Sequence, residues 1–406
     1  MKIHFKILFF LLVNFQLCFA QWQLQSPPQL VSLWAVSFTD KNNGTAVGDF
    51  GIILRTKNGG TDWVIQTCGT NTWLGRVSFS DSVYGTIVGD LGKILRTTNA
   101  GDTWVNQVSG VTSSIEGVSF SDKDHGIATG EVGVILRTSD GGANWILQQH
   151  PSHELFRGAC LADSNNGNIV GDFGTILRTT NGGIDWIQQN SNTTSHLLGV
   201  WFSDINNGTV VGETGAILRT NDAGQNWILQ TSGTIEDLWS VSFTDSINGT
   251  AVGDNKTILR TTDAGINWVA QINSAPYGLK SVSFVDSNTG WAVGENGAIL
   301  HTTNGGVTFI GDEEFEVLPN EYYLAHNYPN PFNPNSIISY ELPVSGFVSL
   351  KVYDVLGNEV ATLVNENIEA GKHSINFDAS KFTSGIYFYR IQAGDFVDTK
   401  KMILMK

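Results

Sequence analysis

Short apolar segments alternate with polar, glycine-rich turns along most of the chain. In the first such unit the apolar segments cover residues 33–39, 45–48, 52–56 and 63–66, and the turns between them contain Asp, Asn and Gly. Runs of this length with turn residues at both ends are typical of β-strands rather than helices. The pattern predicts units of four short strands.

The unit repeats seven times at a constant interval of 41 residues. The glycine that precedes an acidic residue after the second strand marks the period, at Gly48, Gly89, Gly130, Gly171, Gly212, Gly253 and Gly294. Four strands in about 40 residues form one blade of a β-propeller, and each blade buries its faces against its neighbours. We therefore expect an all-β protein with a seven-bladed β-propeller over residues 21–311.

The turn before the fourth strand of each unit combines a short polar residue, small residues and an aromatic residue. The polar and aromatic positions are Asn58 and Trp63, Asn99 and Trp104, Asp140 and Trp145, Asn181 and Trp186, Asp222 and Trp227, Asp263 and Trp268, and Asn304 and Phe309. The polar side chain can bond the turn backbone, the glycines accept positive φ, and the aromatic ring can pack beneath. We interpret these residues as scaffold.

This turn, TSDGGANW in the third unit, resembles the Asp-box of bacterial neuraminidase repeats. The whole unit, SFTD…NGTAVGDFGIILRTKNGGTDW, is similar to the repeat of photosystem II stability/assembly factor-like propellers over residues 22–310. The resemblance implies the propeller fold and a structural role for the Asp-box. It says little about the ligand, because propellers carry many functions.

Two segments can complete the last blade. Trp22 lies one period before Trp63, so residues 22–25 can supply the fourth strand of the seventh unit. The alternative is Phe309-Ile310, in which Phe309 replaces the expected Trp. Because Trp22 is in register, we expect the N-terminal strand to close the ring.

A second module follows the propeller. Residues 312–321 form an acidic linker, and residues 322–406 contain several short strands that predict a small immunoglobulin-like β-sandwich. The segments NYPNPFNP, LKVYDVLGNEVATLV, SGIYFYRIQAGDF and TKKMILMK closely resemble the type A sorting domain of the type IX secretion system. The resemblance implies that residues 322–406 engage that machinery. It also implies that the protein reaches the outer-membrane surface of a Gram-negative bacterium or is released from it.

The N-terminus and the charge agree with export. Residues 1–20 have a basic start, a short apolar core and small residues before Gln21, which together predict a signal peptide. Its removal leaves Cys68 and Cys160, which lie in different repeats and are expected to stay unpaired. The net charge of −15 argues against a nucleic-acid partner, and the mature chain has no stretch predicted to span a membrane.

Positions that are alike in all blades are interpreted as scaffold, whereas positions that differ are candidates for specific binding. Asp40 and Arg55, with their copies, end the first and third strands at one rim, and we expect them to form a repeated contact. At the opposite rim one position of the first strand varies: Trp34, Gly75, Glu116, Arg157, Leu198, Trp239 and Lys280, with Arg76 beside it. The loops between blades add Trp73, His150, His153, His196 and Tyr277.

The same rim carries one carboxylate per blade: Asp49, Asp90, Glu131, Asp172, Glu213, Asp254 and Glu295. These residues either form a collar that attracts cations or cap their own turns, and the second reading is favoured. Trp residues beside Arg and Glu are suited to a sugar or a peptide, although packing between blades accounts for them equally well.

The sequence gives no support for catalysis. Sialidases share the Asp-box but need an arginine triad, and Arg76 and Arg157 are the only arginines of the propeller outside the repeat pattern. No nucleophile motif, metal-ligand cluster or cofactor-binding loop is present, so we expect no catalytic residue, metal or cofactor. Our hypothesis is a secreted or cell-surface binding propeller whose ligand is a glycan or a protein. The alternatives are a glycoside hydrolase and an assembly or stability factor for an envelope complex.

Overall fold

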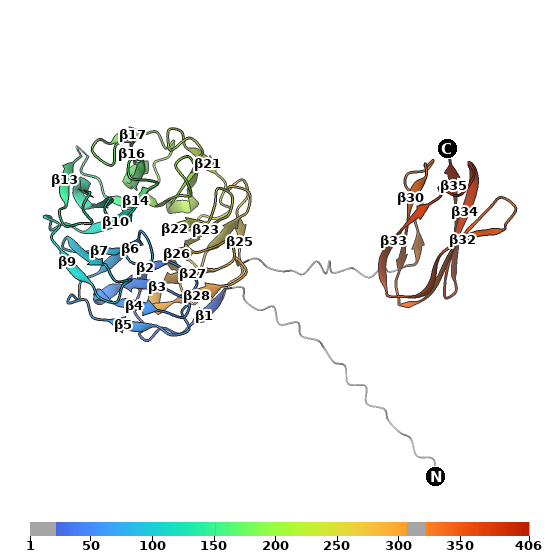
Figure 1. Ribbon diagram of the computed structural model, residues 1–406, viewed down its shortest axis with the longest axis horizontal. Helices are drawn as coiled ribbons and strands as arrows, with labels where there is room; N and C mark the ends of the chain where they lie inside the picture. Colours follow the sequence, from blue (N-terminus) through green and yellow to red (C-terminus); the bar gives the residue numbers. More distant parts are fainter. Residues whose placement is uncertain (1–21, 151, 307–320, 406) are drawn as a thin grey trace, which may run out of the picture. The chain divides into compact units, whose positions relative to one another are not determined.

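The computed structural model describes residues 22–150, 152–306 and 321–405, and the chain divides into two compact units, Met1–Thr308 and Phe309–Lys406. The predicted signal peptide, Phe309 and most of the acidic linker lie outside the described residues. The first unit is a ring of seven four-stranded antiparallel sheets (Figure 1). The predicted fold class and blade number are confirmed.

The innermost strand of each blade lines a central channel. These strands are β2 (Leu33–Phe38), β6 (Leu74–Phe79), β10 (Ile115–Phe120), β14 (Phe156–Leu161), β18 (Leu197–Phe202), β22 (Leu238–Phe243) and β26 (Leu279–Phe284). The second strands are β3 (Gly44–Gly48), β7 (Gly85–Gly89), β11 (Gly126–Gly130), β15 (Gly167–Gly171), β19 (Gly208–Gly212), β23 (Gly249–Gly253) and β27 (Gly290–Gly294). All five residues of every second strand are buried.

Two further strands complete each blade toward the outside. The third strands are β4 (Ile53–Thr56), β8 (Lys93–Thr97), β12 (Val134–Thr138), β16 (Ile176–Thr179), β20 (Ile217–Thr220), β24 (Ile258–Thr261) and β28 (Ile299–Thr302). The outer strands are β5 (Val64–Gln66), β9 (Val105–Gln107), β13 (Ile146–Gln149), β17 (Ile187–Gln189), β21 (Ile228–Gln230), β25 (Val269–Ala270) and β1 (Gln23–Gln25). One-turn 3₁₀ segments follow five of the second strands: η1 (Asp49–Gly51), η2 (Glu131–Gly133), η3 (Asp172–Gly174), η4 (Glu213–Gly215) and η5 (Glu295–Gly297).

The N-terminal strand closes the ring, as the repeat register predicts. In the last sheet β1 pairs with β28, and Leu24 lies opposite Leu300. Trp22 is fully buried, bridges to Asn273 and packs edge-on against Phe284 at 5.7 Å between ring centroids. The first and last segments of the propeller sequence therefore share one blade.

Glycines at both ends of the second strand allow close packing within each blade. A Cβ atom on Gly44 would lie 2.3 Å from the Phe38 ring, and one on Gly48 would lie 2.0 Å from the carbonyl oxygen of Ser32. Atoms cannot approach so closely, so a side chain at either position would displace the first strand. The strict repetition of these glycines follows from this contact.

The rim that carries the turns between third and fourth strands is called the lower rim. Here Asn58 accepts a hydrogen bond from the Asp62 amide at 2.9 Å, Gly59 and Gly60 have φ of 70° and 85°, and Trp63 packs edge-on against Phe38. The expected mechanics of the turn are present. Its assignment to the Asp-box family stays a prediction.

The repeated Asp and Arg residues of the lower rim lie near enough to interact electrostatically, as Asp40 and Arg55 do, but they do not form the direct contact that was predicted. Asp40 accepts hydrogen bonds from the amides of Asn42 and Asn43, at 2.7 and 2.9 Å, and so closes its own turn. The arginines instead join neighbouring blades: Arg219 donates to Thr209 and to the carbonyl of Ser246 in the next blade. None of the repeated pairs forms an ion pair in the part of the chain that the structure describes. A turn-closing role satisfies the carboxylate locally, which leaves the arginine free to reach across.

The second unit is a two-sheet β-sandwich, as predicted. One sheet has the order β29 (Tyr323–Leu324), β30 (Asn335–Leu342) and β33 (Gly371–Asp378). The other has the order β32 (Glu359–Ile368), β31 (Gly346–Tyr353), β34 (Gly385–Ala393) and β35 (Phe396–Leu404). Alternate residues point into a shared core that includes Leu350, Tyr389 and Met402. The described residues of both units contain no helix long and apolar enough to cross a membrane.

Candidate binding site at the upper mouth of the propeller

The opposite end of the ring, the upper rim, carries the turns between second and third strands and the loops between blades. Pairing between the first two strands skips one residue in every blade, from Leu33 to Ala35 in blade one. The skipped residue is a β-bulge, a feature that re-aims a side chain out of the ladder. The seven bulge residues are the variable ones: Trp34, Gly75, Glu116, Arg157, Leu198, Trp239 and Lys280. We call them, with Trp73 and Arg76, the upper mouth.

One side of the mouth is aromatic. Trp34 meets Trp239 and Trp73 edge-on, with ring centroids 6.2 and 5.9 Å apart. The indole N–H groups of Trp34 and Trp239 donate to Asp49 and Asp254, each at 2.8 Å. These hydrogen bonds fix both rings, which stay partly exposed. Rigid, half-exposed Trp rings are suited to stacking against a flat ligand surface.

Lys280 supports this aromatic side from below. Its side chain is 6% exposed, and its ammonium lies 2.7 Å from Asp254 and 3.3 Å from Glu295. The ammonium also lies 4.2 Å from the centre of the Trp239 ring and 5.6 Å from that of Trp34. Burial of a cation is tolerated where carboxylates and π-faces surround it, as they do here. Lys280 is therefore a structural cation of the mouth.

The other side of the mouth is charged. Arg76 donates to the carbonyl oxygens of Gly75 and Trp34, at 3.1 and 3.5 Å, and Ser114 donates to Glu116 at 3.2 Å. Burial lowers the pKa of Arg76, and the charge of Glu116 opposes that shift. Burial also raises the pKa of Glu116, although Arg76 and Ser114 favour its ionised form. These groups leave donors and acceptors facing a partly dehydrated space, which suits a polar ligand.

Most of the predicted acidic collar is engaged by other residues of the mouth. Asp49 and Asp254 hold the indoles, Asp90 and Glu131 accept from Ser114, Asp172 pairs with Arg157 at 2.7 Å, and Glu295 pairs with Lys280. No side chain caps the 3₁₀ turn of its own blade at η1 to η5. Asp49, Asp172, Asp254 and Glu295 thus contact variable residues of the mouth, a role that neither prediction names.

The predicted loop residues separate into two groups. Trp73 covers Gly75, where a Cβ atom would lie 2.0 Å from its ring, and His196 lies 2.7 Å from Asp172. His150 instead bonds Ser152 at 2.9 Å, and burial lowers its pKa. Within the described part of the chain, His153 and Tyr277 form no hydrogen bond, ion pair or ring contact with the residues of the mouth, so the geometry does not support these two predictions.

The channel below the mouth has a volume of about 360 Å³ and contains a residue that the sequence analysis missed. One position of the inner strands is serine in five blades. Three of these serines accept a hydrogen bond from a backbone amide of the neighbouring blade: Ser119 from Leu161, Ser242 from Phe284 and Ser283 from Phe38. In blade five the position is Trp201, which is 40% exposed in the channel wall and donates to the carbonyl of Phe243. The same comparison of copies at this position would have singled it out.

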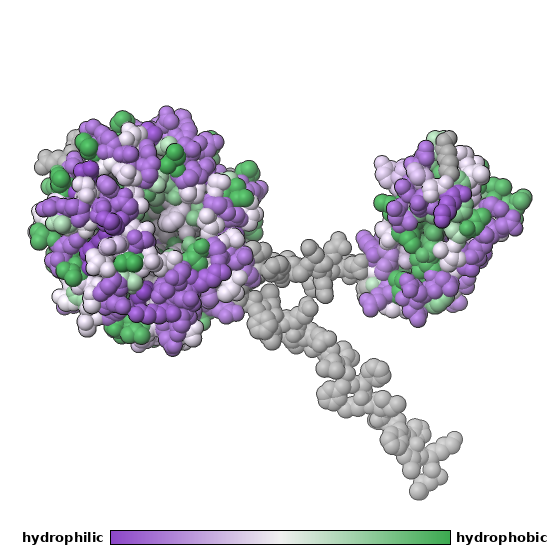
Figure 2. All heavy atoms as spheres, viewed as in Figure 1, coloured by the Kyte–Doolittle hydropathy of each residue, from purple (hydrophilic) through white to green (hydrophobic). Residues whose placement is uncertain are grey.

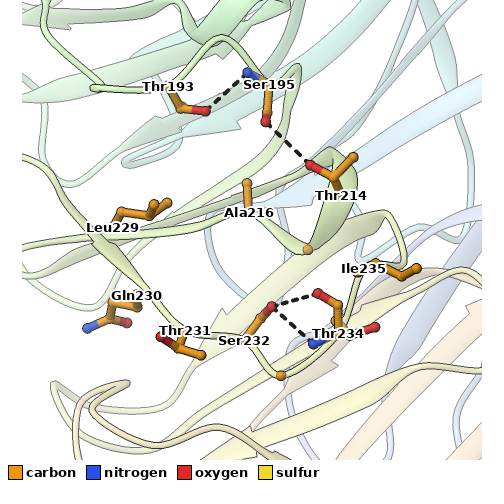
Figure 3. A pocket seen from close by; sticks show the side chains of 12 residues that line it. Thr193, Ser195, Thr214, Ala216, Leu229, Gln230, Thr231, Ser232, Thr234 and Ile235 are labelled. Atoms are coloured by element: carbon orange, nitrogen blue, oxygen red, sulfur yellow. Dashed lines mark hydrogen bonds between the residues drawn. The ribbon is translucent and has the colours of Figure 1, made fainter.

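Two hollows lie between the outer loops of the upper rim. In blade five a hollow of about 660 Å³ is lined by hydroxyl groups, including Ser195, Thr214 and Ser232 (Figure 3). Its counterpart in blade one has about 510 Å³ and is lined by Phe50 and Cys68 among others. Cys68 and Cys160 are free, and burial raises the pKa of Cys160 to about 11, so that thiol is unreactive.

The mouth combines fixed indole rings with partly buried charged groups. No group of three metal-binding side chains occurs within residues 22–150, 152–306 and 321–405. The face of the propeller in Figure 2 is mainly hydrophilic and is hollowed at the centre. Fold and site together define a seven-bladed β-propeller with a chemically varied mouth.

The chain belongs to the Photosynthesis system II assembly factor YCF48 family. The family model matches residues 16–109, 106–238, 184–268 and 229–320, more than half of the chain. A second model, the secretion system C-terminal sorting domain, matches residues 326–405 and assigns the protein to type IX export. Among curated proteins, no sequence matches this one.

Solved structures agree with the fold. YCF48 bound to a D1 peptide is 20% identical, with a TM-score of 0.60 over 70% of this chain and 95% of that chain. YCF48 from Cyanidioschyzon merolae is 19% identical, with a TM-score of 0.60 over 70% and 99%. PorZ, a surface component of the type IX secretion system of Porphyromonas gingivalis, is 11% identical, with a TM-score of 0.54 over 94% and 60%.

Proposed function

We propose that this protein is a non-catalytic binding propeller that acts at the cell surface or after release, and that its upper mouth holds a glycan or a protein segment. The variable bulge position is the observation that carries the proposal. The seven equivalent residues lie on β-bulges at the same rim, and they differ in chemistry while the rest of the blade repeats. Selection for folding alone favours similar residues at equivalent positions, as the serine ring of the channel illustrates.

The chemistry of the mouth supports a ligand with both a flat apolar face and polar groups. Trp34 and Trp239 offer fixed rings, whereas Arg76 and Glu116 offer a donor and an acceptor across the opening. A channel of about 360 Å³ lies at the lower end of the range of small-molecule pockets, about 300–1,000 Å³. One sugar unit or one extended peptide end matches these features.

A glycan array and a peptide library, both probed with the secreted protein, test the proposal. We expect Trp34→Ala and Trp239→Ala each to weaken binding at least tenfold, as loss of a stacking anchor does. Ile235→Ala is the matched control, because Ile235 is an 84% exposed residue of the same rim, outside the mouth. Equal binding by all three variants would place the ligand elsewhere.

The same preparation separates binding from hydrolysis. A hydrolysis screen on the array glycans is expected to show no turnover. Turnover that Glu116→Ala or Asp90→Asn abolishes would establish the glycoside hydrolase alternative.

Family membership supports a second candidate, an assembly or stability factor for an envelope complex. YCF48 has been solved with a peptide of D1, so one relative binds a polypeptide. Co-purification of one defined envelope complex with the wild-type protein, but not with Trp34→Ala, would favour this candidate over a glycan receptor.

A further inference from the structure

Four blades carry an exposed apolar residue at the tip of the upper-rim turn. These residues are Phe50, Leu91, Val132 and Phe173, in blades one to four, and they are 74, 70, 60 and 66% exposed. We call this set the apolar crescent. It is distinct from the mouth, because its members belong to the turns between second and third strands.

The turn itself does not require apolar residues. Phe50 and Gly51 have φ of 57° and 71°, and two successive positive φ values define a turn that favours Asn-Gly. Blade seven has that pair, Asn296-Gly297. A β-branched residue such as Val132, at φ 57°, is a poor choice on backbone grounds alone.

Packing does not explain the crescent either. At 60–74% exposure each side chain keeps most of its surface in water. The ring contact recorded for the crescent within the described residues joins Phe173 to His196, with centroids 5.0 Å apart. Clustered exposed apolar side chains on a stable protein mark interaction surfaces, and aromatic residues are enriched there.

The negative charge beside the crescent limits the kind of partner that can dock there. Each apolar residue directly follows a carboxylate, namely Asp49, Asp90, Glu131 or Asp172. The chain also carries a net charge of −15. An anionic lipid surface would be repelled at the points where the apolar tips have to enter it. A protein with apolar pockets bordered by Lys or Arg satisfies both features.

Blades five to seven show the contrast. Their turn tips are polar, with Thr214, Asn255 and Asn296 at the equivalent positions. The hollows beside the tips do not differ in this way, because both mix polar and apolar residues. The hollow beside Thr214 includes Leu229 and Ile235 (Figure 3), and the hollow beside Phe50 includes Ile65 and Cys68. Among the turn tips, the apolar residues are confined to blades one to four, as expected for a docking surface and not for a property of the repeat.

We propose that the apolar crescent docks a protein partner whose contact face combines apolar pockets with surrounding cationic side chains. This surface is separate from the mouth, and the proposal does not depend on which ligand the mouth holds. Apolar burial provides the attraction. Asp172 is already paired with Arg157, but Asp49, Asp90 and Glu131 accept hydrogen bonds from neutral groups and can select a basic partner.

A four-residue variant tests the proposal without threatening the fold. Asn favours positive φ, so Phe50→Asn, Leu91→Asn, Val132→Asn and Phe173→Asn combined are expected to give an unchanged or higher Tm. In parallel, the photo-crosslinking amino acid benzoylphenylalanine is placed at position 50 or 173 of the full chain, or at position 214 as the matched control. Crosslinking is carried out on the cells that secrete the protein.

We expect crosslinking from positions 50 and 173 to give a protease-sensitive adduct of one discrete mass. The yield of this adduct from position 214 should be at least tenfold lower. The adducted protein, once purified, should bind the wild type at least tenfold more tightly than the Asn variant, and added salt should weaken that binding. Three results would overturn the proposal: no adduct, an adduct with a second copy of this chain, or equal binding by the Asn variant. Sedimentation of the wild type but not the Asn variant with phosphatidylcholine or phosphatidylglycerol vesicles would assign the crescent to lipid and would also overturn it.

Discussion

The two rims of the propeller are made by the same repeat, yet they differ in regularity. At the lower rim, Asp40 and its copies close their own turns, and arginines such as Arg219 join neighbouring blades. At the upper rim, a bulge in every blade presents residues as different as Trp34 and Glu116. The ring is stabilised where the copies agree, and its chemistry lies where they differ.

The largest expected loss of stability comes from a substitution in the packing of the lower rim. Trp227 is 3% exposed and packs edge-on against Phe202 at 6.0 Å. Trp227→Ala leaves a cavity beneath the turn and should lower the free energy of unfolding by about 3–5 kcal/mol. Urea denaturation followed by circular dichroism measures the loss. Ile235→Ala, at an exposed upper-rim site, should stay within about 0.5 kcal/mol of the wild type. Equal losses of unfolding free energy in Trp227→Ala and Ile235→Ala would contradict the view that the lower rim stabilises the ring.

A smaller loss is expected from a contact between blades. Arg219 donates to Thr209 at 2.8 Å and to the Ser246 carbonyl at 2.7 Å, and it lies over the Phe243 ring at 4.9 Å. Arg219→Ala should cost about 1–3 kcal/mol, because it leaves buried acceptors unpaired. Arg219→Lys keeps the charge but not the planar fork, so it should recover only part of the loss in the same urea titration. Full recovery would show that charge alone matters.

Ionisation of a carboxylate should stabilise the fold at the lower rim, at Asp286, and destabilise it at the upper mouth, at Glu116. At the lower rim, burial alone would raise the pKa of Asp286, but Lys41 and the amides of Asn288 and Thr289 outweigh it and lower the pKa to about 2. The folded pKa lies below the ordinary value of 3.8, so the stabilisation is present above that value and is lost as pH falls through about 2. Thermal unfolding should show the wild type above Asp286→Asn in Tm at pH 7, with the gap closing near pH 2. A gap that does not change with pH would contradict the assignment.

The smallest expected effect is at the upper mouth, where removing the charge of Glu116 should raise Tm and not lower it. Burial raises the pKa of Glu116, so ionisation of this side chain opposes folding at neutral pH. Glu116→Gln should therefore raise Tm at pH 7, and the gain should shrink as pH falls through the folded pKa of Glu116, because the wild-type group is then protonated. A lower Tm for Glu116→Gln at pH 7 would show that its pairing with Arg76 outweighs burial.

The periodic features were readable from the sequence because folding depends on them directly. The spacing of Gly48 and its copies gave the blade number, and the register of Trp22 gave the closing strand. The variable position was recognised, but its location on a bulge was not, because pairing registers depend on neighbouring strands. The contact between Asp40 and Arg55 was mispredicted, since proximity along a rim does not say whether a carboxylate bonds its own turn first.

Two features escaped the sequence analysis for different reasons. Trp201 sits at a position where only one copy in seven is aromatic, inside a strand whose other copies indicate scaffold. Phe50 and Phe173 lie between an acidic residue and a glycine that already indicate a turn, and the sequence alone does not show that the apolar residue between them is exposed. Exposure and a positive φ, which only coordinates supply, separate them from scaffold.

Hydrogen–deuterium exchange of the secreted protein, with and without a soluble fraction of the cell envelope, tests most directly whether specificity is confined to the upper rim. We predict protection in peptides that cover residues 31–36, 113–118 and 237–241, with residues 56–63 and 220–227 of the lower rim unchanged. Protection at the lower-rim turns, with the bulge peptides unchanged, would contradict the account.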